Sequence, residues 1–305
     1  MPYFRCLVSM LFGLIAAFAV APELRAEDKV DLELVLAVDV SGSVDPDEAR
    51  LQRDGYVSAL TDADVVRAIA GGFRGAIALS YIEWAGDAYK TVISDWVRID
   101  DTDSANRFAS RIAEEPYFTG LWTSISGVIE FALPRFANNG FDGARRVIDI
   151  SGDGANNDGR PVTMARNMAV AARVTVNGLP IVNDRLNSFG RKQIPNLDLY
   201  YRHCVIGGTG AFLVVAKGFE AFAKAIKRKL IFEIAGTAPP NKILVVGPSR
   251  RFKPSAALRR ANLSLRGSPD ASNALLHLMG TDRTPPPCDI GERLLEQRRR
   301  DYDDY

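Results

Sequence analysis

The sequence predicts an α/β fold in which a mostly parallel sheet is doubly wound, with helices on both faces. Apolar runs with β-branched content alternate along the chain with segments of helical periodicity. The first run, Asp31–Asp39, is almost continuously apolar, which is typical of a central strand buried on both faces. A short polar loop and a helix follow it directly. We therefore expect a six-stranded, Rossmann-like sheet with one antiparallel edge strand.

Five further runs supply the remaining strands. The third strand follows a Gly86-Asp87 turn closely enough to form a hairpin with the second, which makes it the antiparallel edge strand. The six predicted strands are Asp31–Asp39, Gly75–Trp84, Lys90–Val97, Val147–Ser151, Val174–Val182 and Ala211–Val215.

Helix signals stand between these runs. Asp45 is a good N-cap and Pro46 suits the first helical position, so a helix begins there. Apolar spacing of three and four residues predicts the other helices. They cover Asp103–Ala113, a segment beginning near Thr123-Ser124, Pro161–Ala172, and Phe219 to about Ile234.

Residues 1–26 have the pattern of a secretory signal peptide. Arg5 precedes the apolar run Cys6–Ala21, which is short for a membrane span. Cleavage after Ala26 is favoured over cleavage after Ala21, because Pro22 would follow the latter. An uncleaved N-terminal anchor is the alternative. We expect an exported, periplasmic or secreted protein without stable membrane insertion after cleavage.

Without residues 1–26, the chain has 36 basic and 36 acidic residues. This balance gives no indication of nucleic-acid binding through bulk charge. The predicted domain covers residues 30–235.

Residues 236–305 differ in composition. From residue 237 onward the chain holds eight of the 16 prolines, with 12 basic and eight acidic residues. We expect a largely disordered, Pro/Arg-rich tail, in which Ile243–Val246 could add a short strand and Ala274–Met279 a short helix. Cys204 and Cys288 remain after signal removal. They either form a disulfide or stand apart as a buried strand cysteine and an exposed tail cysteine.

Three loops rich in oxygen donors adjoin the predicted core elements. The first, Asp39-Val40-Ser41-Gly42-Ser43, leaves the first strand. The second contains Thr123 and enters a helix, and the third, Ser151-Gly152-Asp153-Gly154, leaves the fourth strand. If the first and fourth strands are neighbours, their loops converge at the carboxyl edge of the sheet. Thr119 is the rival to Thr123, but the helix that starts just after Thr123 favours the latter.

This donor set suits a hard divalent cation. Mg²⁺ takes oxygen ligands, keeps several waters and uses one or two protein carboxylates. Asp39 and Asp153 would together balance its charge, while the hydroxyls of Ser41, Ser43 and Thr123 add none. The ion would stay electrophilic enough to accept a carboxylate from a partner. Each element alone has a simpler explanation, as a helix cap or a turn residue.

Together these residues resemble the metal-ion-dependent adhesion site (MIDAS) of von Willebrand factor A domains. Asp39, Ser41 and Ser43 match the Asp-x-Ser-x-Ser motif, Thr123 the second-loop threonine, and Asp153 the third-loop aspartate. The resemblance implies that the hydroxyls ligate the metal directly, and the carboxylates directly or through water. Mg²⁺, or else Mn²⁺ or Ca²⁺, is the implied metal, and an acidic side chain of a protein partner its ligand.

A finer resemblance is to an exported bacterial subfamily of uncharacterised function. Two features depart from the wider family: the third loop reads Ser-Gly-Asp-Gly where many members have Thr-Asp-Gly, and Trp122 stands where a small residue is common. The segments that carry the finer resemblance are Tyr81–Trp84, Thr123–Gly127, Asn177–Pro180 and Cys204–Gly208.

The residues favour a binding protein over an enzyme. Only His203 and His277 are histidines, and no Gly-x-Ser-x-Gly elbow, zinc spacing or Walker loop is present. A hydrolase or phosphotransferase using Asp39 or Ser41 is one alternative, and a scaffold with a vestigial metal site is another. Asp149, inside a buried strand, is interpreted as a structural residue, by capping or by pairing with Arg145 or Arg146, in preference to a metal contact.

Overall fold

The computed structural model describes residues 27–187, 189–248 and 283–303. The predicted signal segment 1–26 and the predicted helix Ala274–Met279 lie outside these residues. The strands are β1 (Asp28–Val30), β2 (Leu32–Asp39), β3 (Ile77–Trp84), β4 (Lys90–Ile99), β5 (Phe141–Gly143), β6 (Arg146–Gly152), β7 (Thr175–Val182), β8 (Leu213–Lys217) and β9 (Ile243–Val246). The helices are α1 (Pro46–Leu60), α2 (Ala63–Ala70), α3 (Thr102–Glu114), α4 (Ile125–Ala132), α5 (Val162–Ala171), α6 (Leu197–Tyr200), α7 (Phe222–Ala235) and α10 (Ile290–Asp303).

The main sheet has the order β4-β3-β2-β6-β7-β8-β9, and every pairing in it is parallel except that of β3 with β4. This confirms the predicted doubly wound fold and its antiparallel edge strand. The sheet has seven strands where six were predicted, because the apolar run Ile243–Val246 pairs with β8. A separate two-stranded sheet joins β1 to β5.

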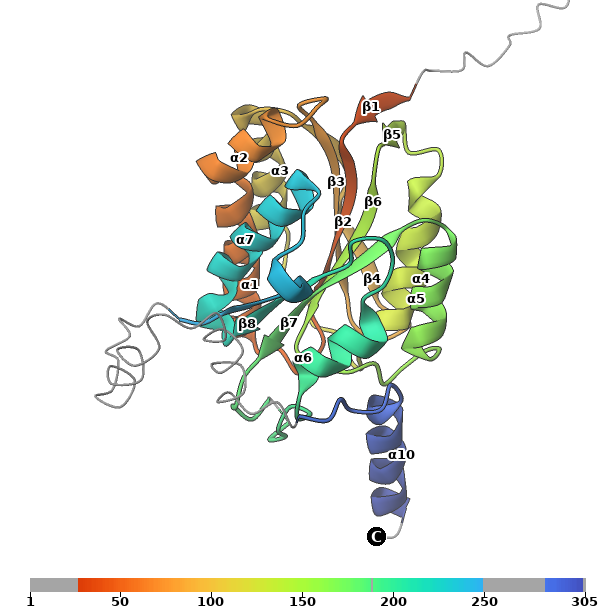
Figure 1. The fold of residues 1–305 in the computed structure, drawn as a ribbon. Coiled ribbons are helices and arrows are strands. Elements are labelled where there is room, and N and C mark those ends of the chain that lie inside the picture. Colours follow the sequence, from red (N-terminus) through yellow and green to blue (C-terminus); the bar gives the residue numbers. More distant parts are fainter. Residues whose placement is uncertain (1–26, 188, 249–282, 304–305) are drawn as a thin grey trace, which may run out of the picture.

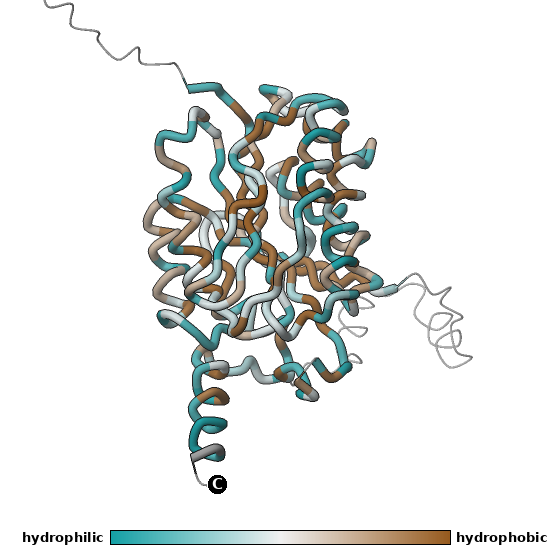
Figure 2. Tube along the Cα trace, turned by 180° about the vertical axis from the view of Figure 1, so that it is seen from behind, coloured by the Kyte–Doolittle hydropathy of each residue, from teal (hydrophilic) through white to brown (hydrophobic). Residues whose placement is uncertain are grey.

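Helices cover both faces of the sheet. Figure 1 shows α1, α2, α3 and α7 on one side and α4 and α5 on the other. Alternate residues of β2 serve the two layers: Leu34 and Leu36 join the core beneath α1 and α7, whereas Val35 and Ala37 join the core beneath α4 and α5. Figure 2 shows the apolar stretches concentrated along the central strands.

The helix α2 was not predicted, although the sequence carries a signal for it. Asp62 caps its first turn by accepting a hydrogen bond from the Asp64 amide at 2.8 Å. Val65 and Ile69, four residues apart, are buried. This spacing is the one that places both side chains on the same helical face.

A charged cluster lies inside the core between β6 and α7. Lys229 Nζ lies 2.7 Å from Asp149 Oδ1 and 2.5 Å from Glu233 Oε1, and all three side chains are fully buried. Burial and the neighbouring Glu233 raise the pKa of Asp149 to about 7, although Lys229 opposes the shift.

The predicted pairing of Asp149 with Arg145 or Arg146 is therefore wrong. Arg145 donates to the carbonyls of Glu233 and Ile234 at the end of α7, and Arg146 pairs with Glu33 at 3.2 Å. Arg146 lies three residues before Asp149 on β6, so the two side chains point to opposite faces of the sheet. Arg145 lies before the strand, four residues and therefore about 13 Å along the chain from Asp149.

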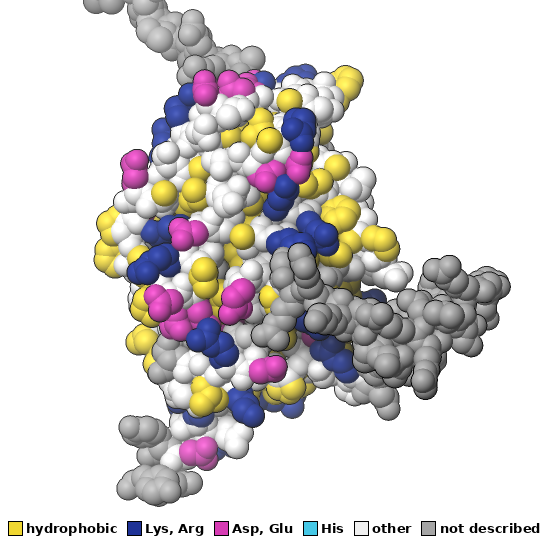
Figure 3. Space-filling model, turned by 90° about the vertical axis from the view of Figure 1, so that its left-hand side faces the viewer, with side chains coloured by type: hydrophobic (Ala, Val, Ile, Leu, Met, Phe, Trp, Pro, Cys, Tyr) yellow, Lys and Arg dark blue, Asp and Glu magenta, His cyan; other side chains and the backbone are white. Residues whose placement is uncertain are grey.

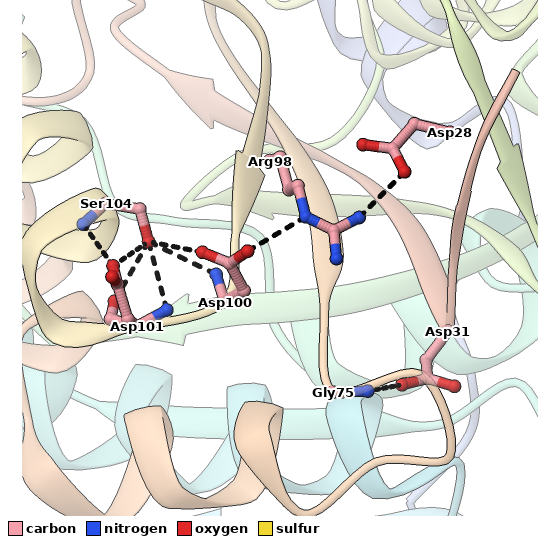
Figure 4. A network of polar contacts seen from close by, with 7 residues as sticks. All are labelled: Asp28, Asp31, Gly75, Arg98, Asp100, Asp101 and Ser104. Atoms are coloured by element: carbon pink, nitrogen blue, oxygen red, sulfur yellow. Dashed lines mark hydrogen bonds and ion pairs between the residues drawn. The ribbon is translucent and has the colours of Figure 1, made fainter.

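A polar network fixes the edge of the sheet where β2 begins (Figure 4). Arg98 of β4 pairs with Asp28 of β1 and with Asp100, at 3.0 and 2.9 Å. Asp31 accepts hydrogen bonds from the amides of Arg74 and Gly75, at 3.0 and 3.1 Å. These contacts hold the loop before β3 against the start of β2.

We expect Asp31→Ala to lower the free energy of unfolding by about 1–3 kcal/mol, since two backbone amides lose a charged acceptor. Urea denaturation followed by circular dichroism measures the change. The exposed Asp142, for which the structure gives no side-chain hydrogen bond, provides the control: Asp142→Ala should leave the transition in place. Equal midpoints for the two variants would contradict this role of Asp31.

In the segment after residue 235, the described residues include the strand β9 and the helix α10. A disulfide joins Cys204 to Cys288 across 84 positions of the sequence, which resolves the alternatives left by the sequence. Cys204 is buried, as in the alternative without a disulfide, but it lies in the helical turn Tyr201–Val205 that follows α6 and not in a strand. Among the described residues, no helix combines the length and the apolar content needed to cross a bilayer.

Charges on the visible part of the α1, α2, α3 and α7 face are mixed in sign (Figure 3). Lys227 of α7, for example, lies 2.8 Å from Asp62 and 2.7 Å from Asp64 of α2. Interspersed ion pairs of this kind are typical of a solvated surface. A cluster of buried hydroxyl and carboxyl groups lies instead at the carboxyl edge of the sheet.

Candidate metal centre

The first loop leaves β2 at the carboxyl edge of the sheet, the lower edge in Figure 1. Asp39 is the last residue of β2 and is fully buried; its Oδ1 accepts a hydrogen bond from the Ser41 amide at 2.7 Å. The backbone continues along β3 for one more residue, where the Val40 amide donates to the Trp84 carbonyl. The second oxygen, Asp39 Oδ2, lies beside the end of β6, 2.8 Å from the position that a Cβ on Gly152 would take.

Hydroxyl groups connect the first loop to the third. Ser41 Oγ lies 3.0 Å from Ser43 Oγ, and Ser43 Oγ donates to Asp153 Oδ1 at 2.6 Å. Since β2 and β6 are hydrogen-bonded neighbours, Asp39 and Asp153 leave adjacent strands. The sequence predicted that these two loops converge if the first and fourth predicted strands are neighbours. In the structure these strands, β2 and β6, are neighbours and the two loops meet.

Thr123 joins the site from the second loop. Ser41 and Gly120 form a parallel β-bridge, and the Thr123 amide donates to Asn157 Oδ1 of the third loop at 2.8 Å. The Thr123 hydroxyl lies 3.4 Å from the position that a Cβ on Gly154 would take. Thr123 is buried, whereas Thr119 is exposed.

The N-cap of α4 is Ser124, whose hydroxyl accepts from the Gly127 amide at 3.1 Å. Capping of α4 therefore does not account for Thr123. Trp122, immediately before it, has a φ of 63°, a left-handed conformation that costs a non-glycine residue about 1–3 kcal/mol and that clusters at functional loops.

The centre contains two buried carboxyl groups, Asp39 and Asp153, whose pKa values are both raised. Burial and the nearby charge of Asp153 raise the pKa of Asp39 to about 8. Burial likewise raises the pKa of Asp153 to about 6. Asp39 Oδ2 is buried and has no hydrogen-bond partner among the described residues. An unpaired carboxylate oxygen in such a place is costly unless a cation or a proton compensates it.

Two further residues of the centre were not found from the sequence. Tyr201 places a buried hydroxyl against Gly152, where a Cβ would lie 2.9 Å from Tyr201 Oη and 2.8 Å from Asp39 Oδ2. Asn157 holds the second loop to the third. Tyr201 carries no sequence signal, because it comes from the helical turn after α6 and reaches the site only through the fold.

The donor set fits a hard divalent cation. Asp39 and Asp153 supply two negative charges, and Ser41, Ser43 and Thr123 supply neutral oxygens. Among the described residues, no group of three or more histidine, cysteine, aspartate or glutamate side chains is placed to hold a metal. The centre described above has only two carboxylates, and its other three oxygen donors are hydroxyl groups, so it does not belong to that class of site.

A pocket of about 350 Å³ opens beside these residues. Ser43, Thr123 and Asp153 contribute to its lining, and so do residues of the C-terminal helix α10, which projects from the same edge of the sheet (Figure 1). The first turn of α10 is fixed to the third loop: Asn156 Nδ2 donates to Glu292 Oε1 at 2.8 Å.

Comparison with known proteins places the domain in a family. Residues 29–238 match the family described as "Protein of unknown function (DUF1194)". A search of curated proteins gives no match.

A search of solved structures gives matches of low sequence identity. Proximal thread matrix protein 1 from the mussel byssus, determined with a zinc-occupied MIDAS motif, has 14% identity and a TM-score of 0.50 over 68% of this chain. This chain covers about half, 49%, of that protein. Conserved hypothetical protein BatB from Bacteroides thetaiotaomicron has 17% identity and a TM-score of 0.41 over 68% of this chain and 100% of its own.

The likeness to the byssus protein concerns the fold alone and agrees with the von Willebrand factor A-like architecture predicted from the sequence. The family match covers more than half of the chain, including every residue of the three loops described above. The chain belongs to the DUF1194 family, whose domain here has a von Willebrand factor A-like fold.

Proposed function

We propose that the chain is a divalent-metal-dependent protein-binding module that is exported to the bacterial periplasm or secreted. Asp39, Ser41, Ser43, Thr123 and Asp153 would hold Mg²⁺, or Mn²⁺ or Ca²⁺ in its place. The bound ion would supply an electrophilic position for a carboxylate of a partner protein. The observation that carries the proposal is the buried, unpartnered Oδ2 of Asp39 beside the hydrogen-bonded set Ser41, Ser43 and Asp153.

The residues of the candidate metal centre each have a defined part in this proposal. Asp39 is held by the Ser41 amide, so its free oxygen has a fixed direction. Ser43 and Asp153 are linked before any ion arrives, which lowers the entropy lost on binding. The Asn157 side chain holds Thr123 by its backbone amide, so the threonine hydroxyl stays available as a metal ligand.

Two observations support an exported location. The N-terminal residues have the pattern of a signal peptide. The disulfide between Cys204 and Cys288 is typical of an oxidising compartment such as the periplasm.

Isothermal titration of Mg²⁺ or Mn²⁺ into chelator-treated protein tests the metal site. We expect a binding heat from the wild type and none from Asp39→Ala, which removes one of two anionic ligands. Asp31→Ala is the matched control, because Asp31 immediately precedes the same strand at its opposite end and should retain the heat. Equal heats from the wild type and Asp39→Ala would contradict the proposal.

A second measurement separates a working site from a vestigial one. Ligand binding to the folded state alone adds about 2.7 kcal/mol of stability at a hundredfold excess over Kd. The melting temperature of the wild type should therefore rise with Mg²⁺ and return on chelation. Capture of a partner from an envelope extract should likewise be lost on chelation.

A further inference from the structure

The helix α10 supplies part of the lining of the pocket next to the candidate metal centre. Leu294, Arg298 and Asp301, one helical turn apart, face this pocket, and Arg298 also lines the adjoining hollow beside Ser41 and Trp122. Their spacing of three and four residues places them on one face of the helix.

The position of α10 is defined by close contacts. A Cβ on Gly291 would stand 1.9 Å from the Asn156 carbonyl oxygen, so the helix approaches the third loop backbone to backbone. Asn156 also donates to Glu292, and the disulfide at Cys288 ties down the residue just before the helix. Because Asn156 follows Asp153 by three residues, the face of α10 that lines the pocket has a fixed position relative to Asp153.

The pocket has an excess of positive charge that the described residues leave unpaired. Arg191, Lys192 and Arg298 line it and form no ion pair within the described part of the chain, and Asp301 is the one carboxylate there in the same condition. Of the other acids in the lining, Glu48 lies 3.8 Å from Arg185 and Asp153 belongs to the metal centre. Three cations thus stand against one free carboxylate.

Arg191 and Arg298 are close enough to act on each other. Burial, and then the charge of Arg191, lower the pKa of Arg298. Both arginines line the pocket and the adjoining hollow. Two guanidinium groups gathered in this way from separate elements repel each other, and a carboxylate between them removes the repulsion and accepts paired hydrogen bonds.

Exposed apolar side chains line the pocket and the adjoining hollow. Trp122 is 46% exposed and Phe189 55%, and Leu121 and Leu294 are exposed beside them. Arg191 stacks over the Phe189 ring at 5.8 Å. Aromatic residues and arginine are the types enriched where proteins bind proteins, so this rim favours a polypeptide ligand.

We propose that the pocket selects a polypeptide segment carrying two acidic side chains, one for the metal centre and one for the Arg191–Arg298 pair. This inference rests on the proposed function, since the first acid needs the metal. It adds a second anchoring point that the three metal-binding loops do not contain and that α10 completes.

Fluorescence anisotropy with short labelled peptides tests the inference. One peptide carries a single aspartate among glycines and serines, and a series carries two aspartates separated by one to four glycines. With Mg²⁺ present, the best two-aspartate peptide should bind at least about tenfold more tightly than the single-aspartate peptide, as expected for one additional charged hydrogen-bonded contact. Arg298→Gln and Arg191→Gln should each abolish this advantage.

Arg299→Gln is the matched control, because Arg299 follows Arg298 on the same helix, is exposed and does not line the pocket. This variant should keep the tenfold advantage, and all three variants should keep the Mg²⁺ heat. Equal affinities for one and two aspartates, with the Mg²⁺ heat intact, would overturn the inference and leave the proposed function standing. A missing Mg²⁺ heat in the wild type would instead reject the proposed function.

Discussion

Replacing Lys229 by methionine should lower the free energy of unfolding by about 3–5 kcal/mol, the cost expected for removing one partner of a buried ion pair. The ammonium group of Lys229 lies between Asp149 and Glu233, 2.7 and 2.5 Å away. Without it, two carboxylates face each other in the core with no cation. Guanidinium denaturation at neutral pH measures the loss.

Lys227→Met is the matched control on the same helix. Lys227 pairs with Asp62 and Asp64 at the surface, where an ion pair contributes about 0–1 kcal/mol. The triple variant Lys229→Met, Asp149→Asn, Glu233→Gln removes all three charges and should recover most of the lost stability. If Lys229→Met is as stable as Lys227→Met, the buried cluster does not have the role assigned to it.

The loss should also depend on pH. In the wild type, Lys229 lowers the pKa of Asp149 against the effects of burial and Glu233. Its removal raises that pKa further above the value of an unfolded chain. When a carboxyl group has a higher pKa in the folded state than in the unfolded state, the protein loses stability as the pH rises from the unfolded-state pKa to the folded-state pKa. The deficit of Lys229→Met should therefore be smaller at about pH 5 than at about pH 8.

This cluster also shows where sequence reasoning reached its limit. The apolar run containing Asp149 predicted a buried strand, and the structure confirms it as β6. The partner of Asp149 could not be read in the same way, because it depends on which helix covers that face of the sheet. Arg145 and Arg146 were near in sequence, but Lys229 comes from α7, across the layer.

The candidate metal centre was easier to predict because topology determines it. In a doubly wound sheet, loops that leave neighbouring parallel strands meet at one edge, so the assumption that the first and fourth strands are neighbours was enough to place Ser43 near Asp153. Residues that come from outside these loops gave no comparable signal. Tyr201 reaches Gly152 from a helical turn, and Arg298 reaches the pocket from a segment predicted to be a disordered tail.

The double variant Cys204→Ala, Cys288→Ala should release α10 from the pocket. In the chain-entropy description, a cross-link that closes a loop of 84 residues contributes about 4–5 kcal/mol, and native disulfides commonly contribute about 2–5 kcal/mol. The other contacts that hold the segment are individually weaker. They include an exposed ion pair of Arg283 with Asp198, hydrogen bonds of Asn196 with Arg283 and Thr284, the bond from Asn156 to Glu292, and the packing of Ile290 against the core.

Hydrogen exchange separates local release from general destabilisation. Amides of α10 should lose nearly all of their protection in the double variant, whereas those of β2 and β6 should stay protected and lose only the part that follows the lower global free energy of unfolding. Arg283→Gln is the control, because it removes the exposed ion pair and leaves the disulfide in place; its α10 should stay protected. Undiminished protection of α10 in the double variant would mean that noncovalent contacts are sufficient.

The binding consequences of this variant follow from where each group is anchored. Asp39, Ser41, Ser43, Thr123 and Asp153 lie on loops of the domain itself, so the Mg²⁺ heat should persist. Arg298 leaves with α10, so the advantage of a two-aspartate peptide should fall to the level of a single-aspartate peptide. A reducing compartment would leave Cys204 and Cys288 as thiols and have the same effect. Protein prepared under reducing conditions should therefore bind metal without distinguishing the two peptides, and oxidation should restore the distinction.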